Sequence, residues 1–447
     1  MVDDVLKDVA ENLKSVPRMT GLRDRALDRV VSIQQELIQD APHDPKLVEQ
    51  TAATMFRILD IHKLRGNSNE LKQTLDELRI LVETAEKNEN FEPSKLVNLK
   101  RYLLWGITRT FDESSRYNRT SAAFDKLNEA AEILEEIKSS LPDMELNNVQ
   151  ALLCWNEGIC REIQNEFDQA EQMYEKATQF AARFSSISKQ KHDVLSALSL
   201  EANIANSSGI LKRRIGEIDE AIVRYGKAKE SLERILETRP NRFDLMRKLA
   251  GVYSNLGNSL TNKKDWPAAE QSYRRVIQIV EELQLLLPEN GGNSRFLAGA
   301  LQGVALALTR QDNPDSYQEI VELFDRAIQV TNDGKDESSR DGLLCVIGNN
   351  RSKFLWLQQK DWQAAIEGYQ TVVEKAKVAT QKYPNSQGFL NSQSIAASSL
   401  SEILVANGDL KRAKQIALEN VDFNQKLIDA GKPDAFTLRS LGFAQTS

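Results

Sequence analysis

The chain has little of what several common protein classes need. Only 11 of its 447 residues are proline, 21 are glycine, and aromatic residues make up 6%. Those fractions are too low for an all-β chain with many turns or for a disordered chain. Apolar residues make up 41%, which is enough for a core. The composition therefore favours a folded protein that is not all-β.

An excess of positive charge is also missing. Asp and Glu number 65 against 58 Lys and Arg, for a formal net charge of −7. A general nucleic-acid binder needs a basic face that neutralises phosphates. We therefore expect no nucleic acid among the partners.

Long apolar segments are absent as well. No run approaches the roughly 18 uninterrupted apolar residues of a membrane-spanning helix, so we expect no membrane insertion. The N-terminus, MVDDVLKDVAENLKSV, lacks the basic start and apolar core of a signal peptide. As written, the chain is expected to be cytoplasmic.

Residues that carry catalytic or metal chemistry are scarce. No pair of histidines has the spacing of a zinc site, and the sequence has no Walker loop, nucleophile elbow or Cys-x-x-Cys motif. The odd number of cysteines without a spacing pattern indicates reduced, buried thiols. We therefore predict no catalytic residue, no cofactor, no metal site and no enzyme. The residues considered are His43, His62, His192, Cys154, Cys160 and Cys345.

One basic cluster, Lys212-Arg213-Arg214, has two interpretations. It could meet a phosphate or an acidic group of a partner, or it could be a charged helix end that the helix dipole favours. The second interpretation is preferred.

What the chain does contain is a repeat. Four times, a small or polar residue is followed twelve, sixteen and nineteen places later by Ala, Tyr and a small aliphatic residue. Identical offsets along one chain indicate that one structural unit is repeated. The four sets are Gly158/Ala170/Tyr174/Ala177, Gly209/Ala221/Tyr225/Ala228, Gly257/Ala269/Tyr273/Val276 and Lys353/Ala365/Tyr369/Val372.

The small residues in these sets predict close contact between two helices. A glycine inside a helix costs about 0.5–1 kcal/mol relative to alanine, so close packing is the expected compensation. The alanine must be small for the same reason, because a second helix crosses there. We therefore assign the glycine, alanine and tyrosine positions to packing within the repeat.

The unit from 242 to 288 identifies the kind of repeat. The order Tyr253-x-x-Leu256-Gly257-x-x-Leu260 resembles the first helix of a tetratricopeptide repeat. A turn follows at 262–265, where Asp265 is a good N-cap residue, and the second helix is expected to stop before Pro288.

The spacing of these units predicts unusually long helices. Gly257 lies 48 residues after Gly209, whereas the common unit has about 34 residues. We predict an all-α, right-handed superhelical solenoid of about eight such hairpins. Residues 1–41 are expected to form N-terminal helices that cap the array, 42–433 the repeat solenoid, and 434–447 a C-terminal cap helix.

The first 80 residues carry a more specific pattern in two segments. They are Leu13-x-x-Val16-Pro17-x-Met19-x-x-Leu22-Arg23 and Ile58-Leu59-Asp60-Ile61-His62-Lys63-Leu64-Arg65-Gly66. These segments resemble the region after the membrane anchor in planctomycete-type bacterial serine/threonine protein kinases, where a "VP-x-M-x-x-LR" segment and a "GDIH-x-LLG" helix open a tetratricopeptide array. The chain lacks the glycine-rich loop, the His-Arg-Asp loop and the Asp-Phe-Gly motif of a kinase, so kinase activity is not implied. If the chain is a fragment of such a membrane-anchored kinase, the resemblance implies an extracytoplasmic location.

Asparagines crowd the middle of several expected first helices, although asparagine is a mediocre helix former. In related tetratricopeptide proteins, the first helices line a concave groove whose asparagines grip the backbone of a peptide, since an amide both donates and accepts hydrogen bonds. The alternative is that these side chains bond to neighbouring helices or face water. The candidate peptide-binding residues are Asn156, Asn203, Asn206, Asn255, Asn258, Asn349, Asn350 and Arg351.

These observations favour a non-enzymatic module that binds a protein or peptide segment in the groove, in signalling or assembly. Two further hypotheses stay open. The chain could be the detached regulatory or sensor half of a serine/threonine kinase system, or a self-associating scaffold. An enzyme hidden in the stack would need clustered acids with histidine, and histidine is nearly absent.

Overall fold

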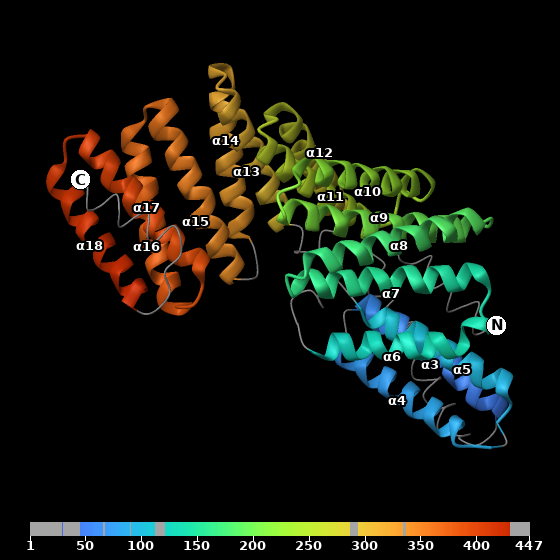
Figure 1. The fold of residues 1–447 in the computed structure, drawn as a ribbon. Helices are drawn as coiled ribbons and strands as arrows, with labels where there is room; N and C mark the ends of the chain where they lie inside the picture. The colour runs from blue at the N-terminus through green and yellow to red at the C-terminus, as the bar shows by residue number, and fades with distance from the viewer. Residues whose placement is uncertain are drawn as a thin grey trace. The chain divides into compact units, whose positions relative to one another are not determined.

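The computed structural model of the protein describes Arg29 and residues 45–65, 68–89, 91–111, 121–286, 294–333 and 337–429. This described part contains sixteen α-helices, α3 to α18, and no strand. Figure 1 shows them following one another as antiparallel pairs. The expected caps at 1–41 and 434–447 lie outside the described residues, apart from Arg29.

The chain divides into two compact units, Met1–Val252 and Tyr253–Ser447, with the boundary inside helix α11. The helices of the first unit are α3 (Pro45–Arg65), α4 (Ser68–Glu86), α5 (Pro93–Thr110), α6 (Ser121–Ile137), α7 (Asp143–Ile163), α8 (Phe167–Ile187), α9 (Lys191–Arg214) and α10 (Ile218–Thr238). After α11 (Phe243–Lys263), the second unit continues with α12 (Trp266–Leu286), α13 (Ser294–Gln311), α14 (Tyr317–Asn332), α15 (Glu337–Phe354), α16 (Trp362–Lys382), α17 (Gln387–Ala406) and α18 (Leu410–Asp429).

The helices pack in order along the chain. Helix α7 packs on α8, α9 on α10, α13 on α14, α15 on α16 and α17 on α18, and within each unit neighbouring pairs also contact each other, as α8 does α9 and α12 does α13. We call the odd-numbered helices first helices and the even-numbered ones second helices. Several second helices have 21 residues, about 30 Å at 1.5 Å per residue. The prediction of an all-α solenoid of eight long tetratricopeptide-like hairpins is confirmed for the described part of the chain.

A tyrosine ring lying on a glycine holds the middle hairpins together. A Cβ atom placed on Gly158 would lie 2.7 Å from Cδ1 of Tyr174, and one placed on Gly209 would lie 2.7 Å from Cε1 of Tyr225. Such distances leave no room for a side chain at the glycine. Tyr174 and Tyr225 are buried as a result.

In the second unit, one tyrosine ring contacts two first helices. A Cβ on Gly257 of α11 or on Gly303 of α13 would lie 2.7 Å from the ring of Tyr273. The tyrosine of α12 is thus held between two first helices. The repeat alanines are buried completely, which allows the second helix to cross closely: they are Ala170, Ala221, Ala269 and Ala365.

The turn between the two helices of a hairpin has a fixed chemistry. The residue five places before the repeat alanine has a positive φ, and the N–H of the next residue donates to a carbonyl near the end of the first helix, as Asp265 does to Leu260 at 2.9 Å. This left-handed conformation closes the helix and suits glycine best. The residues that adopt it are Asn165, Gly216, Lys264, Lys360 and Gly408.

One repeat position was assigned wrongly. Lys353, the residue sixteen before Tyr369, is exposed, whereas Ser352 is buried and lies against Gly368 of α16, where a Cβ would come 2.2 Å from the serine Oγ. The cause is a π-helical turn at Leu355–Gln359. It inserts one residue between the packing position and the turn, so counting back from Tyr369 misses the contact by one.

The tyrosine–glycine contact predicts opposite effects for two alanine substitutions in the first unit. Gly209→Ala places a methyl group into the ring of Tyr225, so we expect a loss of about 1–3 kcal/mol in the free energy of unfolding. Gly226→Ala, in the interior of α10 with nothing within 4 Å of the added carbon, is expected to gain about 0.5–1 kcal/mol. Urea denaturation of both variants measures the difference, and an equal effect of the two would contradict the packing role of Gly209.

The turn conformation makes a second prediction. Lys264 has φ 64°, a region that costs a residue with a side chain about 1–2 kcal/mol and glycine nothing. We expect Lys264→Gly to raise the free energy of unfolding by up to about 1 kcal/mol. The neighbouring Lys263→Gly, inside the last turn of α11, is expected to lower it by about 1 kcal/mol. If neither Lys264→Gly nor Lys263→Gly stabilised the protein in thermal and urea unfolding, strain at this turn would be ruled out.

Candidate functional site

Two neighbouring first helices of the second unit expose a stripe of mixed side chains. On α17 the partly or fully exposed residues recur every three or four positions, which places them on one face of the helix. Helix α15 packs against α17 and has a stripe of the same kind. The stripes contain Gly342, Val346, Asn350 and Lys353 on α15, and Asn391, Ile395, Ser398 and Glu402 on α17. We call this surface the first-helix face.

The apolar members of the first-helix face share one register. Val346 lies six residues before Ser352, and Ile395 lies six residues before Ser401, whose Oγ donates to the carbonyl of Ala413 at 3.1 Å. Val346 is 43% exposed and Ile395 36% exposed. Phe296, near the start of α13, is exposed to the same extent as Val346, and α13 contacts α15. The result is an apolar strip with amide, hydroxyl and charged groups around it.

The asparagines predicted to bind a peptide are used differently in the first unit. Asn156 is buried, and its Nδ2 donates to the carbonyl of Leu152 in its own helix at 2.8 Å. This placement is a correction, because a buried amide cannot grip a ligand in a groove. Asn203 accepts a hydrogen bond from Lys248 Nζ at 3.0 Å, which joins α9 to α11. Asn206 is half-buried on the same face of α9 as Asn203.

In the second unit, Tyr273 Oη donates to Oδ1 of the exposed Asn258 at 2.8 Å, so Asn258 holds the packing tyrosine. Asn255 is half-buried, and the Oδ1 atom of Asn349 is buried without a hydrogen-bond partner. Arg351 forms an ion pair with Asp325 of α14 at 2.6 Å. Asn350 remains half-exposed within the first-helix face.

Buried charged groups of the first unit join successive hairpins. Glu162 of α7 accepts a hydrogen bond from Tyr174 Oη at 2.9 Å and forms an ion pair with Arg214 of α9 at 3.0 Å. Lys212 is buried and pairs with Glu171 and with Glu217. Lys212 and Arg214, two of the three basic residues at this helix end, therefore have acidic partners inside the stack. Glu162 thus links its own helix to α8 and α9.

A second buried carboxylate, Glu145 of α7, accepts hydrogen bonds from two side chains of α5. Arg101 Nε and Trp105 Nε1 each donate to its Oε1 at 2.6 Å. This contact fixes the third hairpin against the second.

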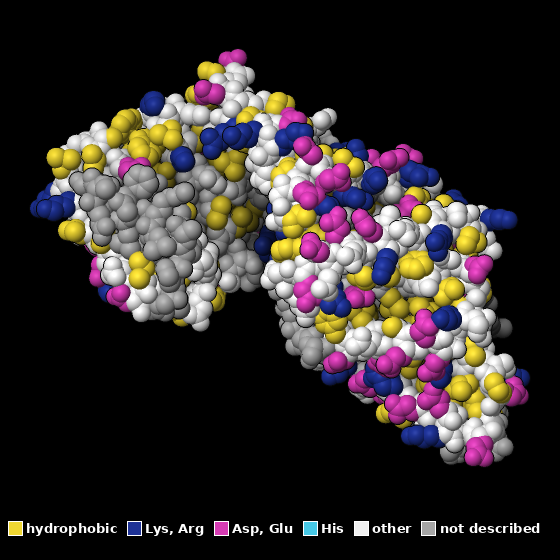
Figure 2. All heavy atoms as spheres, in the orientation of Figure 1, with side chains coloured by type: hydrophobic (Ala, Val, Ile, Leu, Met, Phe, Trp, Pro, Cys, Tyr) yellow, Lys and Arg dark blue, Asp and Glu magenta, His cyan; other side chains and the backbone are white. Residues whose placement is uncertain are grey.

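Over the visible face of α3 to α9, acidic and basic side chains alternate with apolar ones (Figure 2).

The described residues contain no group of three or more His, Cys, Asp and Glu side chains placed to hold a metal ion. His62 is buried in α3 and His192 is exposed at the start of α9, while His43 lies outside the described residues. Of the three free cysteines, Cys345 is buried and the other two are half-buried. No helix in the described ranges is long and apolar enough to cross a bilayer.

Sequence reasoning missed the apolar strip of the first-helix face. Its signal was available, since Val346 and Ile395 each lie six residues before the packing serine of their helix, Ser352 and Ser401. The extra residue of the π turn displaced the register by one and concealed the correspondence.

Comparison with known proteins supports the repeat and the fold. A tetratricopeptide-repeat family model matches residues 249–283. Among solved structures, the apo form of the quorum sensor NprR from B. thuringiensis is similar over 95% of this chain and 99% of its own, with 13% identity and a TM-score of 0.51. The apo form of RapI is similar over 88% and 96%, with 9% identity and a TM-score of 0.50. The sequence matches no curated protein. Residues 249–283 thus match a tetratricopeptide repeat, and the fold of the chain is similar to those of NprR and RapI.

The environment of the thiols predicts slow alkylation. Burial, followed by the nearby Glu157, raises the pKa of Cys154 to about 11, and burial raises that of Cys345 to about 11. The reactive thiolate is then a far smaller fraction at pH 7.5 than for a free cysteine with a pKa of about 8.5. We expect iodoacetamide to label the native protein at least about 100-fold more slowly than the same protein in urea. Equal rates in a mass-spectrometric time course would show that the thiols are not shielded.

Proposed function

We propose that the chain is a non-enzymatic interaction module that holds an extended peptide or a protein segment on the first-helix face. The observation that carries the proposal is the apolar strip of Phe296, Val346 and Ile395, which are exposed on the three successive first helices α13, α15 and α17. Apolar anchors supply most of the affinity in interfaces. Asn350 and Ser398, which lie beside the strip, offer hydrogen bonds to a backbone.

A stack of rigid hairpins suits this task. The buried ion pairs and tyrosine contacts fix successive helices before any partner arrives, so little ordering on the repeat side opposes binding. The likeness to NprR, which is described as a quorum sensor, favours a role in signalling by analogy of fold. The asparagine hypothesis is narrowed to Asn350, which lies within the first-helix face, because Asn156, Asn203 and Asn258 have structural partners.

The kinase-associated alternative gains no support from the site. Of the two motifs behind it, residues 13–23 lie outside the described part of the chain, and Ile58, Leu59 and His62 are buried in α3. Packing within the first hairpin therefore accounts for the second motif. Light scattering on the purified protein tests the other alternative, that the chain is a self-associating scaffold.

Two matched substitutions test the first-helix face. Val346→Asp places a charge in the apolar strip, whereas Val378→Asp places the same charge on α16, where Val378 is 66% exposed. Peptides selected from a random display library against the wild-type chain serve as probes. We expect Val346→Asp to weaken their binding at least about ten-fold and Val378→Asp to change it less than about two-fold. Asn350→Ala is expected to weaken peptide binding by a smaller factor than Val346→Asp.

Circular dichroism and thermal melting of both variants supply the control for folding. Peptides whose binding is insensitive to Val346→Asp while the protein stays folded would contradict the proposal. A dimer in light scattering that Val346→Asp converts to a monomer would assign the strip to self-association instead.

A further inference from the structure

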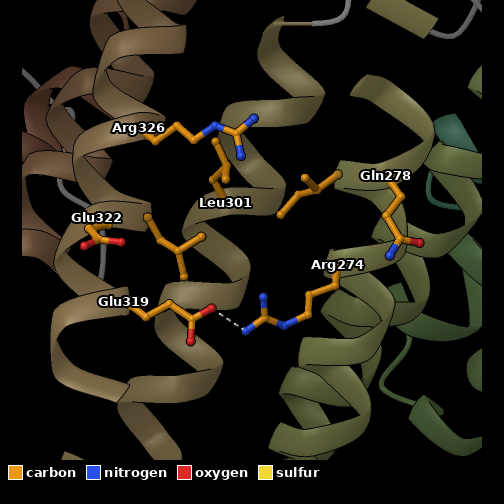
Figure 3. A pocket seen from close by; sticks show the side chains of 8 residues that line it. Arg274, Gln278, Leu301, Glu319, Glu322 and Arg326 are labelled. Atoms are coloured by element: carbon orange, nitrogen blue, oxygen red, sulfur yellow. Dashed lines mark hydrogen bonds and ion pairs between the residues drawn. The ribbon is translucent and has the colours of Figure 1, made fainter. Parts of the chain in front are cut away.

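A cleft of about 350 Å³ opens between the second helices α12 and α14, with α13 behind it (Figure 3). Its floor is apolar, formed by Ile277, Leu301 and Leu323. Leu301 of α13, a first helix, lines the bottom of the cleft and is fully buried. The polar residues around it are Arg274, Gln278, Glu319, Glu322 and Arg326.

Two ion pairs fix the width of the cleft. Arg274 of α12 pairs with Glu319 of α14 at 2.7 Å, and Arg326 of α14 pairs with Glu281 of α12. The members on each helix lie seven residues apart, which is about two turns. The pairs therefore hold α12 and α14 at two levels and leave the apolar floor open between them.

The two arginines are already neutralised. Arg274 also pairs with Glu270 at 2.7 Å. Partial burial lowers the pKa of Arg274, and its bonds to Glu319 and Glu270 more than offset this, so the pKa is raised and the group stays charged. Neither guanidinium is left to attract an acidic partner.

Glu322 differs from the other charged groups of the wall. It is exposed at the cleft, and its carboxylate accepts a hydrogen bond from Gln318 Nε2 at 2.9 Å. The described structure gives it no cationic partner. Across the cleft on α12, Gln278 Oε1 accepts from Arg275 at 3.0 Å, which leaves the amide nitrogen of Gln278 for a further acceptor such as a backbone carbonyl.

We propose that this cleft is a second docking site, separate from the first-helix face, for a protein segment in which a large apolar residue is flanked by lysine or arginine. The apolar side chain enters between the two ion pairs and contacts Ile277, Leu301 and Leu323. The basic neighbour meets the Glu322 carboxylate. An anchor that fills a preformed apolar cleft is the usual centre of an interface, and the unpaired carboxylate selects the charge of the flanking residue.

Defined peptides test the proposal on the full chain. The probe is Gly-Ser-Arg-Phe-Arg-Ser-Gly with 4-fluorophenylalanine as its central residue, followed by ¹⁹F NMR. In the first comparison peptide, both arginines are replaced by glutamate. In the second, the fluorophenylalanine is replaced by alanine, and a fluorinated tag is attached to the end of the peptide. We expect the arginine peptide to bind at least about ten-fold more tightly than either comparison peptide.

Variants assign the binding to the cleft. Glu322→Lys reverses the charge at the cleft, and Glu282→Lys makes the same change at an exposed position of α12 that does not line it. We expect Glu322→Lys to weaken binding of the arginine peptide at least about five-fold, and Glu282→Lys less than about two-fold. Gln278→Trp, which fills the mouth from an exposed position, is expected to abolish binding without loss of helicity.

Three results would overturn the proposal. They are no measurable binding of the arginine peptide to the wild-type chain, equal affinity for the glutamate peptide, and binding that neither Glu322→Lys nor Gln278→Trp changes. Phenethylamine that binds as tightly as the peptide would show that the cleft takes a small amine rather than a protein segment. None of these results bears on the Val346 strip, so the two sites are tested separately.

Discussion

The fold depends on a flat tyrosine ring that lies on a bare helix backbone. Gly158, Gly209 and Gly257 each lack the one atom that would strike the ring of the tyrosine sixteen residues later. The two helices of a hairpin can therefore approach closely along their whole length. That approach buries the repeat alanines and aligns the ends of the helices for the left-handed turn. Helices of 21 residues pack in register because this one contact fixes their relative height.

Much of this architecture could be predicted from the sequence, because the tyrosine–glycine contact leaves a constant spacing behind. The offsets from Gly158 to Ala170 and Tyr174 identified the hairpin, and the period of 48 residues identified the long helices. The spacing gave the wrong packing residue at Lys353, because a π turn adds one residue there and no pattern of side chains indicates it. A one-residue change in backbone winding is invisible to a count of residue types, and it exchanged an exposed lysine for a buried serine.

The candidate surfaces were harder to predict for a different reason. Asparagine is unusual in helices, so Asn156, Asn203 and Asn258 drew attention, yet each satisfies a neighbour inside the repeat stack. Residue type alone does not show which way an amide points. The exposed strip of Val346 and Ile395 consists of ordinary helix residues, and its meaning comes from exposure at a shared register. The cleft of Ile277 and Leu323, which lie 46 residues apart in the sequence, arises only when α12 and α14 come together.

The position of Tyr273 bears on how the second unit comes apart. Its ring lies against Gly257 of its own hairpin and against Gly303 of the following one. In a linear array, stability is the sum of each repeat and its junctions with neighbours. Because one aromatic ring makes both contacts, we expect these two hairpins to unfold together. The cleft between α12 and α14 therefore lies across a rigid joint of the array, where a bound segment would strengthen both hairpins at once.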